Sequence, residues 1–181
     1  MSFQDIKTKR LVIREYSDMY LDQVFEFRSD PSIYSSYTKK QNTKDELKAY
    51  LKENITEFNK QDGYSVFLIL IDEKVIGEIA IMYWDHNNEK NEIGYAIGPM
   101  YRRNGYAYEA VSEIIKYMFE TMKRNRIQAS TDYDNEASKR LLKKLGFIEE
   151  GHFRQTEYKD GVWRDSCSYG LLREDYEKHY V

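Results

Sequence analysis

The sequence predicts an α/β fold of the α+β kind, a mixed and mostly antiparallel sheet of about seven strands with flanking helices. Apolar residues recur at helical spacing in the first third of the chain. They then form continuous runs at 66–71 and 75–84, as in buried strands, and a further strand pattern follows a polar loop at 92–97. After residue 105, segments of helical and strand periodicity alternate. No Pro-, Gly- or Ser-rich linker divides the 181 residues, so a single domain, 1–181, is expected.

The N-terminal third is predicted to contain one strand and two helices. Residues 11–13 form a short apolar strand, and residues 18–28 have helical spacing up to Asp30-Pro31, where the helix should end. Thr43 and Glu46 stand three residues apart, as in a capping box, and mark the start of the second helix. One face of that helix is expected to carry Leu47, Leu51, Ile55 and Phe58.

The middle third is predicted to be an antiparallel meander whose strands are buried on both faces. Its strands are residues 66–71, 75–84 and 92–97. Gly77 lies inside the second apolar run and indicates a β-bulge. Pro99 ends the third strand.

The last third is predicted to alternate between helix and strand and to close with a hairpin. Gly146 would end a helix, and Asp160-Gly161 would form the turn of the hairpin. The expected elements are a helix over 107–118, a strand over 126–131, a helix over 135–145, hairpin strands 147–153 and 162–172, and a short C-terminal helix.

Composition limits the classes of partner. The formal net charge of -3 argues against nucleic acid, and the local basic clusters at 102–103 and 139–144 fit a compact anionic ligand better than a duplex. No apolar run is long enough for a membrane span, and residues 1–5 lack the apolar stretch of a signal peptide. The lone Cys167 fits a reducing compartment. We therefore expect a cytoplasmic protein without membrane or nucleic-acid partners.

Residues 98–107 carry the most informative local pattern. A strand ends, a loop with Gly105 turns the chain, and a helix of good formers begins. The first N–H groups of such a helix have no intrahelical partner, and the helix dipole there favours an anion such as a pyrophosphate. An ordinary strand-to-helix turn remains the alternative. A Walker loop and a dinucleotide fingerprint are both absent.

Three motifs in order resemble the GNAT N-acetyltransferase superfamily. Arg102-x-x-Gly105-x-Ala107 matches its acetyl-CoA signature, and the segment 135–147, which ends in Leu-Gly-Phe, matches its second motif. The continuation to Glu109-Ala110 and the C-terminal segment 160–172 are similar to the branch of Rim-type ribosomal-protein N-acetyltransferases. The resemblance extends from the Thr-Lys-Arg-Leu opening at 8–11 nearly to the C-terminus.

The resemblance implies how acetyl-CoA, as co-substrate, would be held. In this superfamily the fourth and fifth strands, here 92–97 and 126–131, splay apart and the pantetheine arm lies between them. Backbone groups for the pantetheine are expected from Tyr95, Ala96 and Ile97, and Asn135 would also touch this region, with plain helix capping as the alternative. The expected pyrophosphate-binding residues are Arg102, Arg103, Asn104, Gly105, Tyr106 and Ala107.

Acetylation of an amine needs a base for its proton, a donor to the developing oxyanion, and an acid for the departing thiolate. Strand alternation puts Glu92 on one face with Gly94 and Ala96, so Glu92 is the candidate base. In many relatives a tyrosine that acts as the general acid stands where this chain has Leu142. The resemblance to the Rim-type branch instead implies Ser138 as the acid, and Tyr133 is a further candidate. No histidine pair has metal-ligand spacing, so no metal is expected.

The acceptor remains open at this stage. The expected reaction transfers acetyl to a primary amine by direct attack in a ternary complex. A protein N-terminal α-amine is one acceptor class, and a polyamine, aminoglycoside or amino acid is the alternative. A third hypothesis is that the domain binds acetyl-CoA without turnover. Either a monomer or a homodimer is compatible with the sequence. Tyrosines that would shape the acceptor pocket are Tyr34, Tyr37 and Tyr83.

Overall fold

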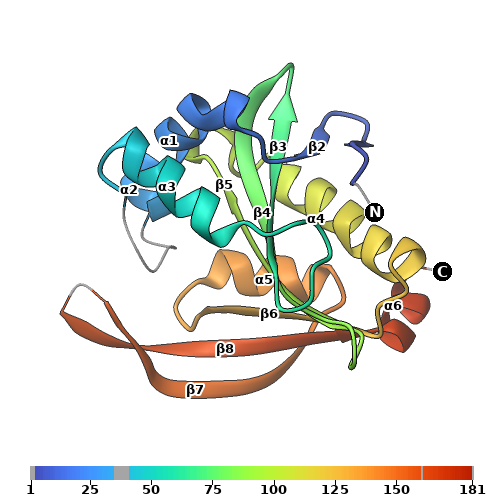
Figure 1. Ribbon diagram of the computed structural model, residues 1–181. Helices are drawn as coiled ribbons and strands as arrows, with labels where there is room; N and C mark the ends of the chain where they lie inside the picture. The colour runs from blue at the N-terminus through green and yellow to red at the C-terminus, as the bar shows by residue number, and fades with distance from the viewer. Residues whose placement is uncertain (1–2, 35–40, 160, 181) are drawn as a thin grey trace.

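The computed structural model describes residues 3–34, 41–159 and 161–180. These residues form one eight-stranded sheet with the order β1-β2-β3-β4-β5-β6-β8-β7 (Figure 1). All neighbouring strands are antiparallel except β5 and β6, which are parallel. The strands are β1 (Ile6–Lys7), β2 (Val12–Glu15), β3 (Tyr64–Ile71), β4 (Lys74–Asp85), β5 (Lys90–Ile97), β6 (Arg126–Asp132), β7 (Ile148–Lys159) and β8 (Val162–Leu172). The predicted fold class is confirmed, with the short β1 as an addition; Asp160 of the predicted turn lies outside the described residues.

Helices cover both faces of the sheet. Residues Val66, Leu68 and Leu70 of β3 form a core with α1 and α3, whereas the alternate residues Phe67 and Ile69 face the larger core under α4, α5 and α6. None of the helices in the described ranges combines the length and apolar character that a bilayer crossing requires. The helices are α1 (Leu21–Ser29), α2 (Pro31–Tyr34), α3 (Lys44–Asn54), α4 (Tyr106–Lys116), α5 (Glu136–Lys144) and α6 (Arg173–Tyr180).

The predicted end of the first helix is confirmed: α1 ends at Ser29, and its C-cap Asp30 is extended. Pro31 then begins the separate helix α2, because a proline fits the first position of a helix, where its N–H would be unpaired anyway. One detail of the second predicted helix is wrong. Phe58 does not share the apolar face of α3, which ends at Asn54. Its ring packs instead on the other side of the sheet, 5.1 Å from the Trp84 ring in an edge-to-face arrangement.

The predicted start of α3 is confirmed by its cap. Thr43 Oγ1 accepts a hydrogen bond from Glu46 N at 3.1 Å. The return bond of the capping box is shifted by one residue, because Glu46 Oε2 accepts from Asn42 N at 2.7 Å.

The two halves of the sheet part from each other at β5. Strand β5 stays paired with β4 from Lys90 to Ile97, but its parallel pairing with β6 covers only Lys90, Asn91 and Glu92. Beyond Glu92 the β6-facing edge of β5 has no strand partner among the described residues. The predicted splay between the fourth and fifth expected strands is thus present, between β5 and β6.

The bulge predicted at Gly77 lies one residue away, at Ile76. Ile69 pairs with Gly77 and Leu70 pairs with Val75, so Ile76 is the extra residue. Gly77 itself is required for close packing, since an added Cβ would lie 2.5 Å from the Ala96 carbonyl oxygen and 2.7 Å from Ile97 Cδ1. A side chain at position 77 would therefore push the end of β5 away from β4.

Replacing Gly77 with alanine is expected to lower the free energy of unfolding by about 1–3 kcal/mol, the usual range for overpacking a core. The matched control is Gly94→Ala on β5, where an added Cβ meets only Met82 Cε, at an ordinary 3.6 Å. Urea denaturation of both variants measures the difference. Equal stability of the two variants would show that the backbone contact at Gly77 does not constrain the sheet.

Candidate active site

The open edge of β5 presents alternate backbone groups to the gap. Gly98 N donates to Ile76 O at 2.8 Å, which makes these two residues a hydrogen-bonded antiparallel pair. Because the bonding side alternates along a strand, the backbone groups of Ala96 face β4, and those of Tyr95 and Ile97 face the gap. Of the three residues expected to hold the pantetheine arm, Tyr95 and Ile97 thus have backbone groups aimed into the gap.

The loop between β5 and α4 presents an array of unpaired donors. Gly105 is the N-cap of α4 and has φ +80° and ψ 2°, and Arg103 also has a positive φ, of 62°. No acceptor among the described residues pairs with the backbone N–H groups of residues 103–108. Successive free N–H groups at the positive end of a helix dipole form a concavity suited to an anion.

The side chain of Arg102 anchors this loop. Its Nε donates to Ile97 O at 3.0 Å, and its second terminal nitrogen donates to Ser32 Oγ at 3.0 Å. The guanidinium therefore joins the end of β5 to α2.

Across the gap, the start of α5 meets β5 through a hydroxyl pair. Asn135 caps α5, its Oδ1 accepting from Ser138 N at 3.1 Å. The Ser138 and Tyr95 hydroxyl oxygens are 3.0 Å apart, so one donates to the other. Burial raises the pKa of Tyr95 to about 12, although the bond with Ser138 opposes the shift. Tyr95 is therefore protonated at neutral pH and available as a donor.

Glu92 lies where the gap begins. It is the last β5 residue paired with β6, opposite Gln128, and it faces Met82 of β4. Its neighbour Ile93 belongs to the core under α4, so strand alternation puts the half-buried Glu92 side chain on the face covered by α1 and α3. Within the described ranges this carboxylate makes no hydrogen bond or ion pair. Glu92 and the Tyr95–Ser138 pair are thus on opposite faces of β5.

A buried ion pair on the face of Glu92 was missed at the sequence level. Arg28 of α1 donates to both carboxylate oxygens of Glu78, at 3.1 and 2.9 Å, and both side chains are buried. Glu78 is the direct cross-strand neighbour of Ala96. Burial also raises the pKa of the adjacent Tyr64, and Glu78 adds to that shift. The signal was present in the sequence, because Glu78 is an acidic residue inside an apolar strand.

The remaining candidates lie at the margin of this region. Tyr133 stacks on His152 with the ring centroids 4.2 Å apart, and His152 bonds to Asp165 at 2.7 Å. The side chain of Tyr83 is exposed, and Tyr37 lies outside the described residues. Leu142, at the position where many relatives have tyrosine, is fully buried in the core. In the described part of the chain, no cluster of three His, Cys, Asp or Glu side chains could hold a metal ion.

Comparison with known sequences identifies close relatives over most of the chain. Residues 10–148 match the family model of the acetyltransferase (GNAT) domain. The uncharacterized N-acetyltransferase YnaD of Bacillus subtilis is 34% identical over 173 residues, which covers 94% of this chain and 98% of that protein. The [ribosomal protein uS5]-alanine N-acetyltransferase of Escherichia coli is 33% identical over 132 residues, which covers 67% of this chain and 64% of that protein.

Solved structures share the fold. The spermidine N-acetyltransferase of Vibrio cholerae, solved in complex with CoA and spermine, superposes with a TM-score of 0.83 at 19% identity and covers 94% of this chain and 99% of that chain. A GNAT-family acetyltransferase from Bacillus anthracis gives a TM-score of 0.80 at 26% identity, covering 94% of this chain and 99% of that chain.

Replacing Gly105 with alanine is expected to weaken CoA binding by about fivefold or more, because an L-residue costs about 1–2 kcal/mol in the left-handed region and will turn the loop N–H groups. Gly161→Ala is the matched control, since Gly161 has φ +79° and no heavy atom within 4 Å of an added Cβ. Calorimetric titration with CoA and urea denaturation compare the two variants. If both bind CoA equally well, the conformation of Gly105 does not determine binding.

Proposed function

The chain belongs to the GNAT acetyltransferase family and is an acetyl-CoA-dependent N-acetyltransferase, and on this premise we propose that it acetylates the α-amine of a protein N-terminus. One structural observation carries the choice of acceptor. Among the described residues Glu78 is the one buried acidic side chain, and Arg28 balances its charge. A polyamine or aminoglycoside carries several positive charges and needs several uncompensated carboxylates in its pocket. An acceptor with a single reacting amine requires no such cluster.

The relatives support the same choice. The ribosomal-protein alanine N-acetyltransferase is related by sequence at 33% identity, whereas the spermidine enzyme shares the fold at 19% identity. A small-molecule acceptor is the second candidate, and its support is limited to that shared fold. The single-domain organisation, the cytoplasmic location and the monomeric or homodimeric state stay predictions.

Acetyl-CoA is proposed to lie along the open edge of β5. Outward backbone groups of Tyr95 and Ile97 would bond the pantetheine amides, with Ala96 and Asn135 lining the arm. The free N–H groups of the β5–α4 loop would hold the pyrophosphate. The residues assigned to this loop site are Arg102, Arg103, Asn104, Gly105, Tyr106 and Ala107.

The two faces of β5 suggest separate roles in the reaction. The amine would approach on the α1 and α3 face in its neutral form. Its nitrogen attacks the thioester carbonyl carbon, and Glu92 accepts one of the nitrogen's protons directly or through a water. The outward N–H of Ile97 is the proposed donor to the oxyanion. When the C–S bond breaks, the thiolate takes a proton from Ser138, which takes one from Tyr95. Solvent then removes the proton from Glu92 and returns one to Tyr95. No covalent acyl-enzyme is needed in this ternary complex.

Glu92→Gln is expected to lower kcat/KM by about 10²-fold or more, the usual contribution of a general base, because glutamine cannot accept the proton. Steady-state kinetics at several pH values should also show that the acidic limb of the wild-type profile is lost. Glu89→Gln, an exposed carboxylate in the preceding turn, is the control. An unchanged acidic limb in the Glu92 variant would exclude this residue as the base.

The acceptor class can be decided by thiol release from acetyl-CoA with three substrates. We expect turnover with a peptide that has a free N-terminal alanine, and none with the same peptide blocked by N-acetylation, because the α-amine is the nucleophile. Spermidine should be at least about tenfold poorer in kcat/KM, a difference of about 1.4 kcal/mol in transition-state binding. Faster turnover of spermidine, or equal turnover of the blocked peptide through its lysines, would contradict the proposed acceptor.

A further inference from the structure

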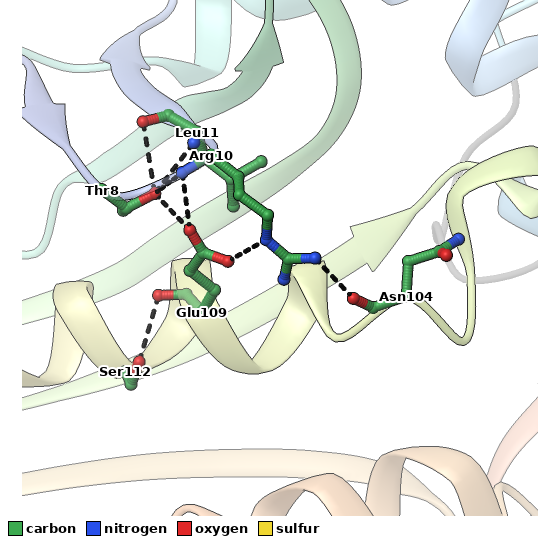
Figure 2. A network of polar contacts seen from close by, with 6 residues as sticks. All are labelled: Thr8, Arg10, Leu11, Asn104, Glu109 and Ser112. Carbon is green, nitrogen blue, oxygen red and sulfur yellow. Dashed lines mark hydrogen bonds and ion pairs between the residues drawn. The ribbon is translucent and has the colours of Figure 1, made fainter.

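A network of polar contacts joins the N-terminal segment to the β5–α4 loop (Figure 2). Thr8 and Arg10 precede β2, whereas Asn104 and Glu109 belong to the loop and the first turn of α4. We call these four residues the Arg10 network. They are separated by about a hundred positions in the sequence, with |i−j| of 101 for Thr8–Glu109 and 94 for Arg10–Asn104.

Both carboxylate oxygens of Glu109 are occupied by this network. Oε1 accepts from Thr8 Oγ1 at 2.6 Å and from Arg10 N at 3.0 Å, and Oε2 accepts from Arg10 Nε at 2.7 Å. Partial burial alone would raise the pKa of Glu109, but the hydrogen bonds from Thr8 and Arg10 lower it overall. Glu109 is therefore ionised at neutral pH, and it fixes the position of the Arg10 guanidinium.

The guanidinium of Arg10 in turn contacts the loop and the helix start on either side of Gly105. One terminal nitrogen donates to Asn104 O at 3.0 Å, and the group lies 4.4 Å from the centroid of the Tyr106 ring. The other terminal nitrogen is 3.5 Å from the position that a Cβ would take on Gly105. Arg10 thus contacts both neighbours of the residue in the left-handed conformation, and it borders the space beside Gly105 itself.

The bond to Asn104 sets the direction of the next N–H group. In a planar trans peptide the C=O and the N–H point in opposite directions. Because Asn104 O points toward Arg10, the N–H of Gly105 points away from it. In Figure 2 Arg10 lies on one side of α4, and the ribbon of α5 lies on the other side. The Arg10 network therefore leaves the free Gly105 N–H directed away from itself and open to a ligand.

From these contacts we propose that Arg10 is a positioning residue for the coenzyme: it holds the Asn104 carbonyl so that the Gly105 N–H faces the pyrophosphate, and Glu109 and Thr8 hold Arg10. The inference rests on the proposed binding of the pyrophosphate by the β5–α4 loop. The Arg10 side chain is 42% exposed and the Glu109 side chain 18%, so water partly screens the pair and reduces its contribution to stability. The network should therefore matter more for binding than for folding.

Arg10→Gln is expected to weaken CoA binding about five- to twentyfold, since a charge-assisted hydrogen bond that orients the loop is lost. The KM for acetyl-CoA should rise by a similar factor, with kcat at saturation unchanged. The control is Arg14→Gln: Arg14, on β2, bonds to Asp5 at 2.8 Å and to Glu73 at 2.7 Å, and within the described residues it makes no hydrogen bond or ion pair with the β5–α4 loop. That variant should bind CoA as the wild type does.

Glu109→Ala distinguishes a positioning role of Glu109 from a purely electrostatic one, because the two roles predict opposite changes in CoA affinity. If Glu109 acts only as a negative charge near the phosphates, its removal tightens CoA binding. If it holds Arg10 on the Asn104 carbonyl, its removal weakens CoA binding, as we expect. Alanine is a good helix former, so α4 should persist.

Calorimetric titration with CoA and thermal unfolding are measured for the wild type and the three variants. Weaker binding in both Arg10→Gln and Glu109→Ala, with melting temperatures close to that of Arg14→Gln, supports the inference. Lower melting temperatures with wild-type CoA affinity would overturn it, since the network would then only attach the N-terminal segment. A wild-type protein that does not bind CoA would instead contradict the proposed function of the loop.

Discussion

The separation of β5 from β6 is the constraint on which the site depends. A strand inside a sheet normally satisfies its backbone groups on both edges, but β5 does so only as far as Glu92. The outward groups of Tyr95 and Ile97 are left facing the gap. One of these backbone groups is already paired, because the Arg102 side chain donates to Ile97 O. The Tyr95 hydroxyl also bonds across the gap, to Ser138. The remaining groups are those that an extended amide-containing ligand can pair with.

The contacts that anchor the β5–α4 loop do not involve its backbone N–H groups. Arg102 joins it to Ile97 and Ser32 through its side chain, and Arg10 contacts it through the carbonyl of Asn104. Both anchors therefore leave the backbone N–H groups of residues 103–108 unpaired. A loop that is already ordered loses little conformational entropy when an anion binds, so the arrangement favours affinity for a pyrophosphate.

The opposite face of β5 has a different electrostatic character. Arg28 and Glu78 form a buried, mutually balanced pair next to Ala96, whereas Glu92 has no such partner among the described residues. Two carboxylates on one face of the sheet thus have distinct environments. The paired one joins α1 to β4, and the unpaired one, Glu92, is the base that we propose for proton transfer. Separation of structural and reactive carboxylates in this way fits an acceptor with a single amine.

The sequence by itself determined the elements and their order, because hydrophobic periodicity, the capping box at Thr43 and the glycine at position 105 are short-range patterns. It also predicted a coenzyme-binding loop through Arg102-x-x-Gly105-x-Ala107, and that role stays a prediction. Only the tertiary structure decided which side chains meet: Tyr95 with Ser138, 43 positions apart, Arg28 with Glu78, 50 apart, and Arg10 with Glu109, 99 apart. The same limit explains Phe58, whose apolar character predicted burial but not the side of the sheet. Such pairings follow from strand order and helix placement, which no local pattern encodes.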